Sequence, residues 1–235
     1  QLETDRRLLR GRIKTILRRL EKVAKQREQG RRSRKRAEIP TMSLVGYTNA
    51  GKSTLFNHIT DADVYAADQL FATLDPTLRK LDLKEVGPVI LADTVGFIRH
   101  LPHDLVAAFK ATLQETQEAD LLLHVVDYSA NNYLETMDEV NTVLDEIDAG
   151  EIQQLIICNK IDQLEEVEPK IDRDEDGMPI RVWLSAKTGQ GTELLFEAIN
   201  DCLAQSMVSY TLKIPPAQSR LRGVLYELDC ISEQS

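Results

Sequence analysis

One eight-residue segment restricts the fold of this chain more than any other. Residues 46–53 read GYTNAGKS and match the pattern G-x-x-x-x-G-K-[ST]. The mainly apolar run 42–45 precedes the segment, and residues 54–59 have the composition of a helix start. In that context backbone N–H groups and a helix N-terminus face a polyphosphate. We therefore expect Lys52 to reach the outer phosphates and the Ser53 hydroxyl to bind Mg²⁺.

A second motif follows the next buried strand. Residues 93–96 read DTVG and match D-x-x-G directly after the apolar run 88–92. Asp93 can hold Mg²⁺ through a bound water, and the flexible Gly96 lets a backbone N–H turn toward a γ-phosphate. The loop 61–77 between the two motifs has little periodicity, which is typical of functional loops. Both of its threonines, Thr73 and Thr77, could supply a further hydroxyl to the metal.

A third motif selects the base. Residues 159–162 read NKID and match N-K-x-D after the apolar run 154–158. The Asp162 carboxylate can accept hydrogen bonds from both N1–H and the exocyclic amine of guanine. Adenine lacks that pair of donors, so it would leave the carboxylate unsatisfied. The stem of Lys160 can lie over the base plane.

The order of strands and helices predicts an α/β fold with a mostly parallel sheet and helices on both faces. Residues 163–179 are acidic and contain two prolines and a glycine, so we expect a surface excursion there. The predicted strands are 41–46, 78–83 (an edge strand), 88–93, 121–126, 154–158 and 180–184, and the predicted helices include 104–118, 133–149 and 191–204.

Charge divides the chain into unlike parts. The whole chain of 235 residues has a net charge of −9, yet residues 1–40 hold 15 Lys+Arg against 5 Asp+Glu, which leaves 14 basic and 33 acidic residues for the rest. A basic arm commonly contacts nucleic acid, and the alternative is a solvated linker. We expect a basic helical linker at 1–39 (the basic arm), a nucleotide-binding domain at 40–206 and a C-terminal appendage at 207–235.

The basic arm has the pattern of a coiled-coil helix over residues 5–28. Leu2, Leu9, Ile16 and Val23 recur every seventh residue, which predicts a partner helix elsewhere. The basic run 31–36 lacks this periodicity, so we expect a mobile connector.

The chain begins with Gln, and we expect a longer protein with a preceding domain. No apolar run approaches the roughly 20 residues of a membrane span, and three cysteines without metal-like spacing favour a reduced, cytoplasmic protein.

The four motifs G-x-x-x-x-G-K-S, D-x-x-G, N-K-x-D and S-A-K (residues 185–187) resemble those of translation-factor-like GTPases over residues 41–204. Within that class the segments QLETDRR (1–7), GYTN (46–49), FATLDPT (71–77) and DTVGF (93–97) resemble the HflX family of ribosome-associated GTPases. The resemblance implies a GTPase that binds the large ribosomal subunit and splits ribosomes under stress. We expect a monomer that contacts the subunit through the basic arm and through two switch loops, residues 61–77 and 93–104.

The resemblance also implies roles for particular residues. It places the switch-loop hydroxyl on Thr73 rather than Thr77, and it places the S-A-K segment around the base. The implied catalytic residues are Lys52, Thr73 and Gly96, and the implied Mg²⁺ ligands are Ser53, Thr73 and Asp93. The implied contacts to GTP or GDP are Gly46, Tyr47, Thr48, Asn49, Ala50, Gly51, Lys52, Ser53, Phe71, Ala72, Thr73, Leu74, Asp75, Asp93, Thr94, Val95, Gly96, Asn159, Lys160, Ile161, Asp162, Ser185, Ala186 and Lys187.

Phe97 departs from a common pattern, because many related GTPases place a water-orienting glutamine after the D-x-x-G glycine. A phenylalanine can neither donate nor accept that hydrogen bond, so we expect slow intrinsic hydrolysis. A partner could supply the missing group, or K⁺ could substitute for it with help from Asn49. The alternative for Asn49 is a turn residue with an unusual backbone. We assign no catalytic role to His58, His100, His103 or His124.

Two other functions remain open on the sequence alone. One is a nucleotide-binding scaffold with negligible turnover, which Phe97 would suit. The other is a GTPase of tRNA modification or of membranes, which Asn49 would suit but the basic heptad helix argues against.

Overall fold

The structure is a computed structural model, and it describes residues 2–60, 76–97 and 113–204. The elements are α1 (Leu2–Arg36), β1 (Thr41–Val45), α2 (Lys52–Thr60), β2 (Thr77–Leu83), β3 (Gly87–Asp93), β4 (Leu121–Asp127), α4 (Tyr133–Glu146), β5 (Gln154–Asn159), the 3₁₀ turn η1 (Ile161–Gln163), β6 (Lys170–Arg173), β7 (Pro179–Trp183) and α5 (Thr192–Ala204). Residues 113–117 are also helical.

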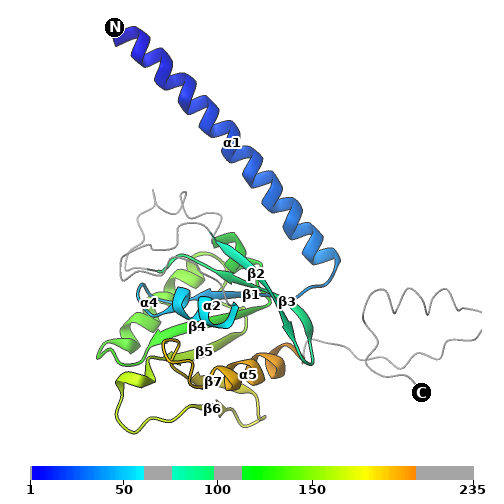
Figure 1. Cartoon of the computed structure of the whole chain (residues 1–235), viewed down its shortest axis with the longest axis vertical. Coiled ribbons are helices and arrows are strands. Elements are labelled where there is room, and N and C mark those ends of the chain that lie inside the picture. The colour runs from blue at the N-terminus through cyan, green and yellow to red at the C-terminus, as the bar shows by residue number, and fades with distance from the viewer. Residues whose placement is uncertain (1, 61–75, 98–112, 205–235) are drawn as a thin grey trace, which may run out of the picture. The chain divides into compact units, whose positions relative to one another are not determined.

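A seven-stranded sheet in the order β2-β3-β1-β4-β5-β7-β6 forms the centre of the fold (Figure 1). The five inner strands pair in parallel, and the edge strands β2 and β6 pair antiparallel with their neighbours. The predicted α/β class with a mostly parallel sheet is confirmed. Because parallel strands end at the same edge, the segments that follow β1, β3, β5 and β7 meet there.

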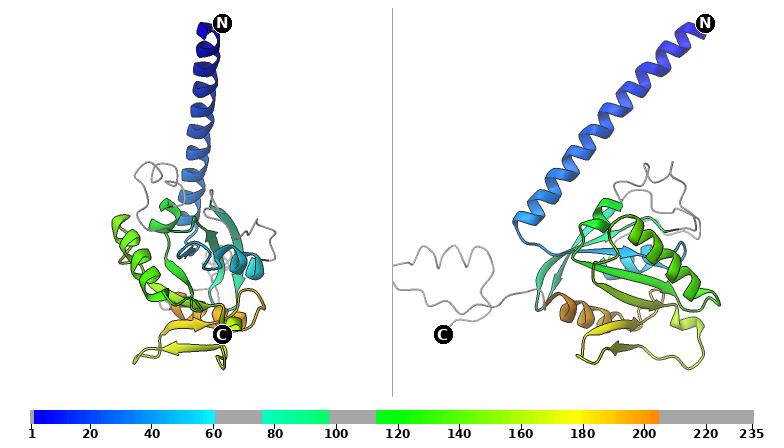
Figure 2. Two further views of the ribbon diagram at one scale, coloured as in Figure 1. Left: turned by 90° about the vertical axis from the view of Figure 1, so that its left-hand side faces the viewer. Right: turned by 180° about the vertical axis from the view of Figure 1, so that it is seen from behind.

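Helices cover the sheet on both faces, as Figure 2 shows. One core layer packs α2 and α5 against the sheet through residues such as Leu44, Phe56 and Ile199. The second layer packs α4 on the opposite face through residues such as Leu122, Val140 and Leu144. The inner strands β1 and β4 are therefore buried from both sides. This burial explains why their sequences are nearly continuous apolar runs.

The predicted surface excursion at 163–179 is largely exposed, but it also contains a strand that we did not predict, β6. That strand is short and charged, so it lacks the apolar alternation of a half-buried strand. A tight turn at its end makes the hairpin: one Asp174 carboxylate oxygen accepts hydrogen bonds from the backbone N–H groups of Asp176 and Met178, at 3.0 and 2.8 Å. Gly177 provides the positive φ of 83° that the turn needs.

The prediction of a mobile connector at 31–36 is wrong, because α1 continues without a break to Arg36. Arg31 is only 7% exposed, and its guanidinium lies 3.2 Å from the Glu115 carboxylate. Arg34 contacts the other oxygen of Glu115 at 2.7 Å. Burial alone would lower the pKa of Arg31, but hydrogen bonds to Glu28 and Glu115 raise it overall. Ion pairs thus order a stretch that has no apolar pattern.

The apolar seam of α1 stays exposed within the described residues. Leu9, Ile13, Ile16, Leu17, Leu20 and Val23 are between 40% and 59% exposed. The partner helix, and the division into parts at 39 and 206, therefore stay predictions. The appendage at 207–235 and much of the predicted helix 104–118 lie outside the described residues. In the described part of the chain, no helix combines the length and apolar character needed to cross a membrane.

Candidate nucleotide site

The segment 46–53, here called the phosphate loop, joins β1 to α2 and depends on two glycines. Gly46 has a φ of +145°, and a Cβ there would lie 2.3 Å from the carbonyl oxygen of Val125 on β4. Gly51 has a φ of +103°, and a Cβ there would lie 2.2 Å from the side-chain nitrogen of Asn159. Only glycine fits both the backbone conformation and these close approaches. The loop is therefore packed between two neighbouring strand ends.

Lys52 begins α2 and turns its side chain back into the phosphate loop. Its ammonium donates hydrogen bonds to the carbonyl oxygens of Gly46 and Tyr47, at 3.0 and 2.8 Å. Burial lowers the pKa of Lys52 to about 8, although the charge of Asp93 opposes the shift. A polyphosphate would raise this pKa again, because a nearby anion favours the charged ammonium.

The predicted Mg²⁺ ligands that the structure describes lie together. The Ser53 hydroxyl donates a 2.8 Å hydrogen bond to the carboxylate of Asp93, which is fully buried at the end of β3. A hydroxyl and a carboxylate beside a phosphate cradle are hard oxygen donors of the kind that Mg²⁺ prefers. These two residues therefore fit a magnesium ion. The third predicted ligand, Thr73, lies outside the described residues, together with Phe71, Ala72, Leu74 and Asp75.

The D-x-x-G segment is joined to the phosphate loop through Phe97. The backbone N–H of Phe97 donates to the carbonyl of Gly46 at 3.1 Å, and the N–H of Thr48 donates to the carbonyl of Phe97 at 3.0 Å. Gly96 lies so close to Thr48 that a Cβ would come within 2.8 Å of its methyl group. The Phe97 ring is 1% exposed and packs with Val45, Val95 and the α4 layer. Phe97 therefore acts as an apolar anchor, and its side chain offers nothing to a water molecule.

Asn159 links three segments at the base-reading end. Its side-chain N–H donates to the carbonyl of Ala50 at 2.8 Å, and its side-chain oxygen accepts from the backbone N–H of Ala186 at 2.9 Å. One buried amide thus ties the phosphate loop to the S-A-K segment. Such a cross-link fixes the position of the phosphate loop relative to the S-A-K segment.

Asp162 and Lys160 lie on the same turn. The Ser185 hydroxyl donates to the Asp162 carboxylate at 2.6 Å and accepts from the backbone N–H of Thr188 at 3.2 Å. Asp162 is otherwise exposed, which the predicted contact with a base requires. Lys160 has the left-handed φ of 66°, and its ammonium lies 2.6 Å from the carboxylate of Asp127.

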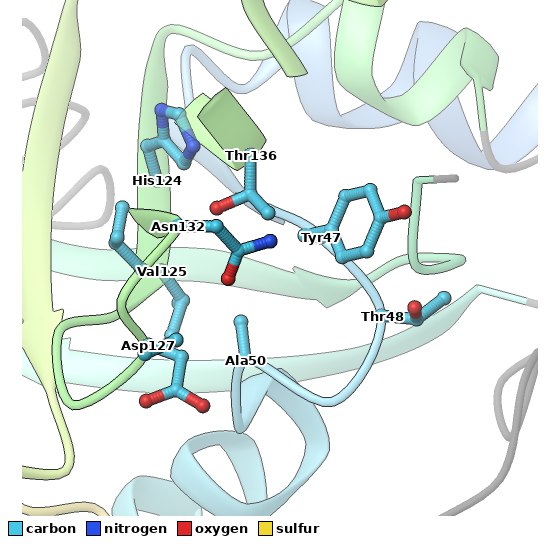
Figure 3. Close-up of a pocket in the computed structure, with 10 residues that line it drawn as sticks. Tyr47, Thr48, Ala50, His124, Val125, Asp127, Asn132 and Thr136 are labelled. Carbon is cyan, nitrogen blue, oxygen red and sulfur yellow. The ribbon is translucent and has the colours of Figure 1, made fainter. Parts of the chain in front are cut away.

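A pocket of about 180 Å³ lies between the phosphate loop, the end of β4 and the start of α4 (Figure 3). Tyr47 and Thr48 line it from the phosphate loop, and Asn132 and Thr136 from α4 and its N-cap. The neighbouring His124 is buried, and burial lowers its pKa to about 4. This histidine is therefore neutral near pH 7.

The structure brings together the described members of the predicted site at one edge of the sheet. Sequence reasoning missed Asp127, the last residue of β4, which contacts Lys160, and Ser129, which holds the Asp127 carboxylate. It also missed the bridging role of Asn159. The position of Asp127 at the end of a buried strand was the available signal, because motif residues occupy the corresponding ends of β3 and β5.

Comparison with known proteins agrees with this geometry. Residues 41–160 match the family model of the 50S ribosome-binding GTPases. The GTPase HflX of Escherichia coli (strain K12) is 64% identical over 234 residues, which cover 100% of this chain and 55% of that protein. The chain belongs to the HflX GTPase family.

A second HflX, from Caldanaerobacter subterraneus subsp. tengcongensis, is 46% identical over 234 residues, which are 100% of this chain and 53% of that protein. The chain thus spans about half the length of the HflX relatives it matches. A GTP-binding protein from Sulfolobus solfataricus in complex with GDP is 29% identical with a TM-score of 0.55, covering 81% of this chain and 58% of that one. Era in complex with MgGDPNP and a 16S ribosomal RNA fragment is 19% identical with a TM-score of 0.53, covering 75% and 59%, and shows the fold alone.

Proposed function

We propose that this chain is a GTP-binding and GTP-hydrolysing switch that associates with the large ribosomal subunit and helps split ribosomes under stress. The buried amide of Asn159 carries the proposal, because it holds the phosphate loop and the S-A-K segment in register around one ligand. Membership of the HflX family supports the ribosomal partner.

In this proposal each motif has one task. Lys52 binds the outer phosphates, and the backbone of Gly96, held beside Thr48 by the Phe97 anchor, donates to the γ-phosphate. Ser53, Asp93 and Thr73 hold Mg²⁺, which when bound neutralises charge on the phosphate oxygens. The remaining predicted contacts in the segments 46–53, 71–75, 93–96, 159–162 and 185–187 complete the site.

Replacing Asp162 by Asn tests the base assignment. An asparagine amide accepts from N1–H but donates where the carboxylate accepted, so it matches the C2 carbonyl of xanthine instead of the amine of guanine. Affinity for GDP should fall by about a hundredfold or more, and affinity for xanthosine diphosphate should rise. Titration of both nucleotides measures this directly. Unchanged preference for guanosine in the variant would refute the proposed base site.

Hydrolysis by this chain alone should be slow, because the buried ring of Phe97 supplies no group to orient water. K⁺ beside Asn49 is one source of the missing charge. Asn49 is exposed and has a left-handed φ of 62°, which also suits a plain turn residue. GTP turnover in KCl and NaCl at equal ionic strength decides between these roles. Equal rates in the two salts would exclude K⁺, and turnover that large subunits fail to raise would favour a scaffold.

The basic arm and the switch loops are the proposed ribosome contacts of a cytoplasmic, monomeric protein. Removing residues 1–24 deletes most of the arm and leaves Glu28, Arg31 and Arg34 at its root. Sedimentation of both forms with purified large subunits, with GDP and with a non-hydrolysable GTP analogue, should show weaker, less salt-sensitive binding after truncation. Equal binding of the GDP and GTP-analogue forms would refute a switch.

A further inference from the structure

Asp127, at the end of β4, lies opposite the first residue of the base-reading motif. The two strand ends are in register, with Asp127 paired to Asn159, and the backbone N–H of Tyr128 donates to the carbonyl of Asn159 at 3.1 Å. Strand pairing therefore sets the position of Asp127 relative to the turn that holds Lys160 and Asp162. No sequence motif includes this aspartate.

One oxygen of Asp127 holds the end of the Lys160 side chain. The ammonium nitrogen lies 2.6 Å from Asp127 Oδ2, and the two side chains are 26% and 27% exposed. A lysine stem has several rotatable bonds, so a free Lys160 would cover the base only part of the time. With its ammonium tethered, the stem is restricted to conformations that start at the base-reading turn and end beside β4.

The other oxygen of Asp127 is itself held in place. Ser129 donates to Asp127 Oδ1 from its hydroxyl at 2.6 Å and from its backbone N–H at 3.2 Å. The same hydroxyl lies 3.2 Å from the side-chain oxygen of Gln163, the last residue of η1. A chain of contacts therefore runs from Lys160 through Asp127 to Ser129, whose single hydroxyl hydrogen is donated to Asp127 at the shorter distance. These contacts fix the Asp127 carboxylate where it meets Lys160. In Figure 3 the Asp127 carboxylate points away from Asn132 and Thr136.

We propose that Asp127 is a positioning residue for nucleotide binding, which holds the stem of Lys160 over the purine while Asp162 reads its edge. The inference rests on the proposed function, because it assumes a guanosine nucleotide in the site. It divides base recognition into two separable tasks. Asp127 and Lys160 support the face of any purine, and Asp162 selects guanine.

The test compares Asp127→Asn with Asp201→Asn in the full chain. Asp201 is a matched control: it is 35% exposed and lies 2.7 Å from the guanidinium of Arg173, in an ion pair that joins α5 to β6. Dissociation of fluorescently labelled GDP is followed by stopped flow, and affinities for GDP, IDP and inorganic pyrophosphate by competition. IDP lacks the exocyclic amine that Asp162 reads, and pyrophosphate lacks a base.

Asp127→Asn should raise the dissociation rates of GDP and IDP by the same factor, about fivefold, and leave the pyrophosphate constant unchanged. Asp201→Asn should change none of the three. In a Lys160→Ala background, Asp127→Asn should add nothing, because its effect passes through the lysine.

Three results would overturn the inference: an equal effect in the Lys160→Ala background, a parallel loss of pyrophosphate binding, or GDP dissociation unchanged by Asp127→Asn. Each leaves the proposed function standing, provided that the parent chain binds GDP. Failure of the parent chain to bind any guanosine nucleotide would instead refute the proposed function.

Discussion

The base-reading end and the phosphate end of the site satisfy their polar groups in different ways. At the base-reading end, Asn159, Lys160 and Asp162 are each bonded to a group from another segment of the domain. At the phosphate end, the ammonium of Lys52 is bonded to carbonyl oxygens of its own loop. The base-reading side chains are held by tertiary contacts that a ligand can leave intact. The Lys52 side chain is held by local contacts that a phosphate must replace.

This difference indicates where selectivity and where affinity arise. A subsite that is already in place loses little conformational freedom on binding, so its contacts discriminate between bases. At the phosphate end, binding exchanges the two neutral carbonyl partners of Lys52 for a charged phosphate. This exchange increases affinity, because a hydrogen bond between two charged groups is stronger than one to a neutral carbonyl. We therefore expect changes at the base-reading end to alter preference and off-rate, and changes at Lys52 to alter pH dependence.

The largest effect is expected where the two ends meet, at Gly51. In Gly51→Ala the new Cβ would displace the Asn159 side chain, and the backbone would be strained at its φ of +103°. We expect affinity for GDP to fall by about a thousandfold, since several kcal/mol of binding free energy are lost. Titration with labelled GDP measures this fall.

Gly177→Ala is the matched control for that substitution. Gly177 also has a positive φ, but no atom lies within 4 Å of a Cβ built there. Only the strain remains, so stability should fall by about 1 kcal/mol and GDP affinity should not change. A loss of GDP affinity in both variants would mean that the loop contacts with Asn159 do not matter.

A substitution at the root of the basic arm provides a reference outside the two ends. Glu115 is 2% exposed and contacts both Arg31 and Arg34. Glu115→Gln breaks a buried ion pair, so the free energy of unfolding should fall by about 3 kcal/mol with GDP affinity unchanged. Glu197→Gln breaks the more exposed pair with Arg173 and should cost less than about 1 kcal/mol. Denaturant unfolding of both variants checks this, and equal losses would contradict a buried role for Glu115.

Removing one hydroxyl group tests the contribution of the base-reading end without changing the phosphate end. Ser185→Ala removes the 2.6 Å hydrogen bond that holds the Asp162 carboxylate. GDP affinity should fall by about tenfold, with Lys52 and the phosphate loop unaffected. Thr188→Ala removes a neighbouring hydroxyl that donates to the side-chain oxygen of Gln190 at 3.4 Å, so it should leave GDP binding unchanged. Competition with pyrophosphate separates the two ends, because only a base-end defect spares it.

The two ends also differ in how far sequence could predict them. Lys52, Ser53, Asp93 and Asp162 follow from motifs, because each chemical role requires one residue type at one spacing from a strand end. The brace on Lys160 does not, since Asp127 is 33 positions away and reaches the turn only through the β4–β5 register. The same reason hid the contact between Arg31 and Glu115, which are 84 positions apart.

The hydrophobic pattern led to wrong or missing predictions where tertiary contacts, and not burial of apolar side chains, order the chain. Strand β6 carries charges at both ends and pairs only at the edge of the sheet, so its sequence has no strand signal. The last turns of α1 look like a solvated run, yet buried ion pairs order them. Periodicity reports burial of apolar side chains, and it cannot report order that comes from paired charges.

The smallest expected effect concerns pH at the phosphate end. The pKa of Lys52 is about 8 in the empty site, so below that pH the ammonium is already charged and binding takes up no proton. Above it, binding must recharge the amine, and GDP affinity should fall by about threefold between pH 7.5 and 8.5.

The unfolded chain has the ordinary lysine pKa of 10.5. It therefore binds more protons than the folded state between about 8 and 10.5, and this group makes the nucleotide-free protein more stable as pH rises there. Binding and stability should thus change in opposite directions, measured by labelled-GDP titration and by denaturant unfolding. Lys52→Arg removes the titration, because arginine stays charged, so a pH-dependent affinity in that variant would assign the effect to another group.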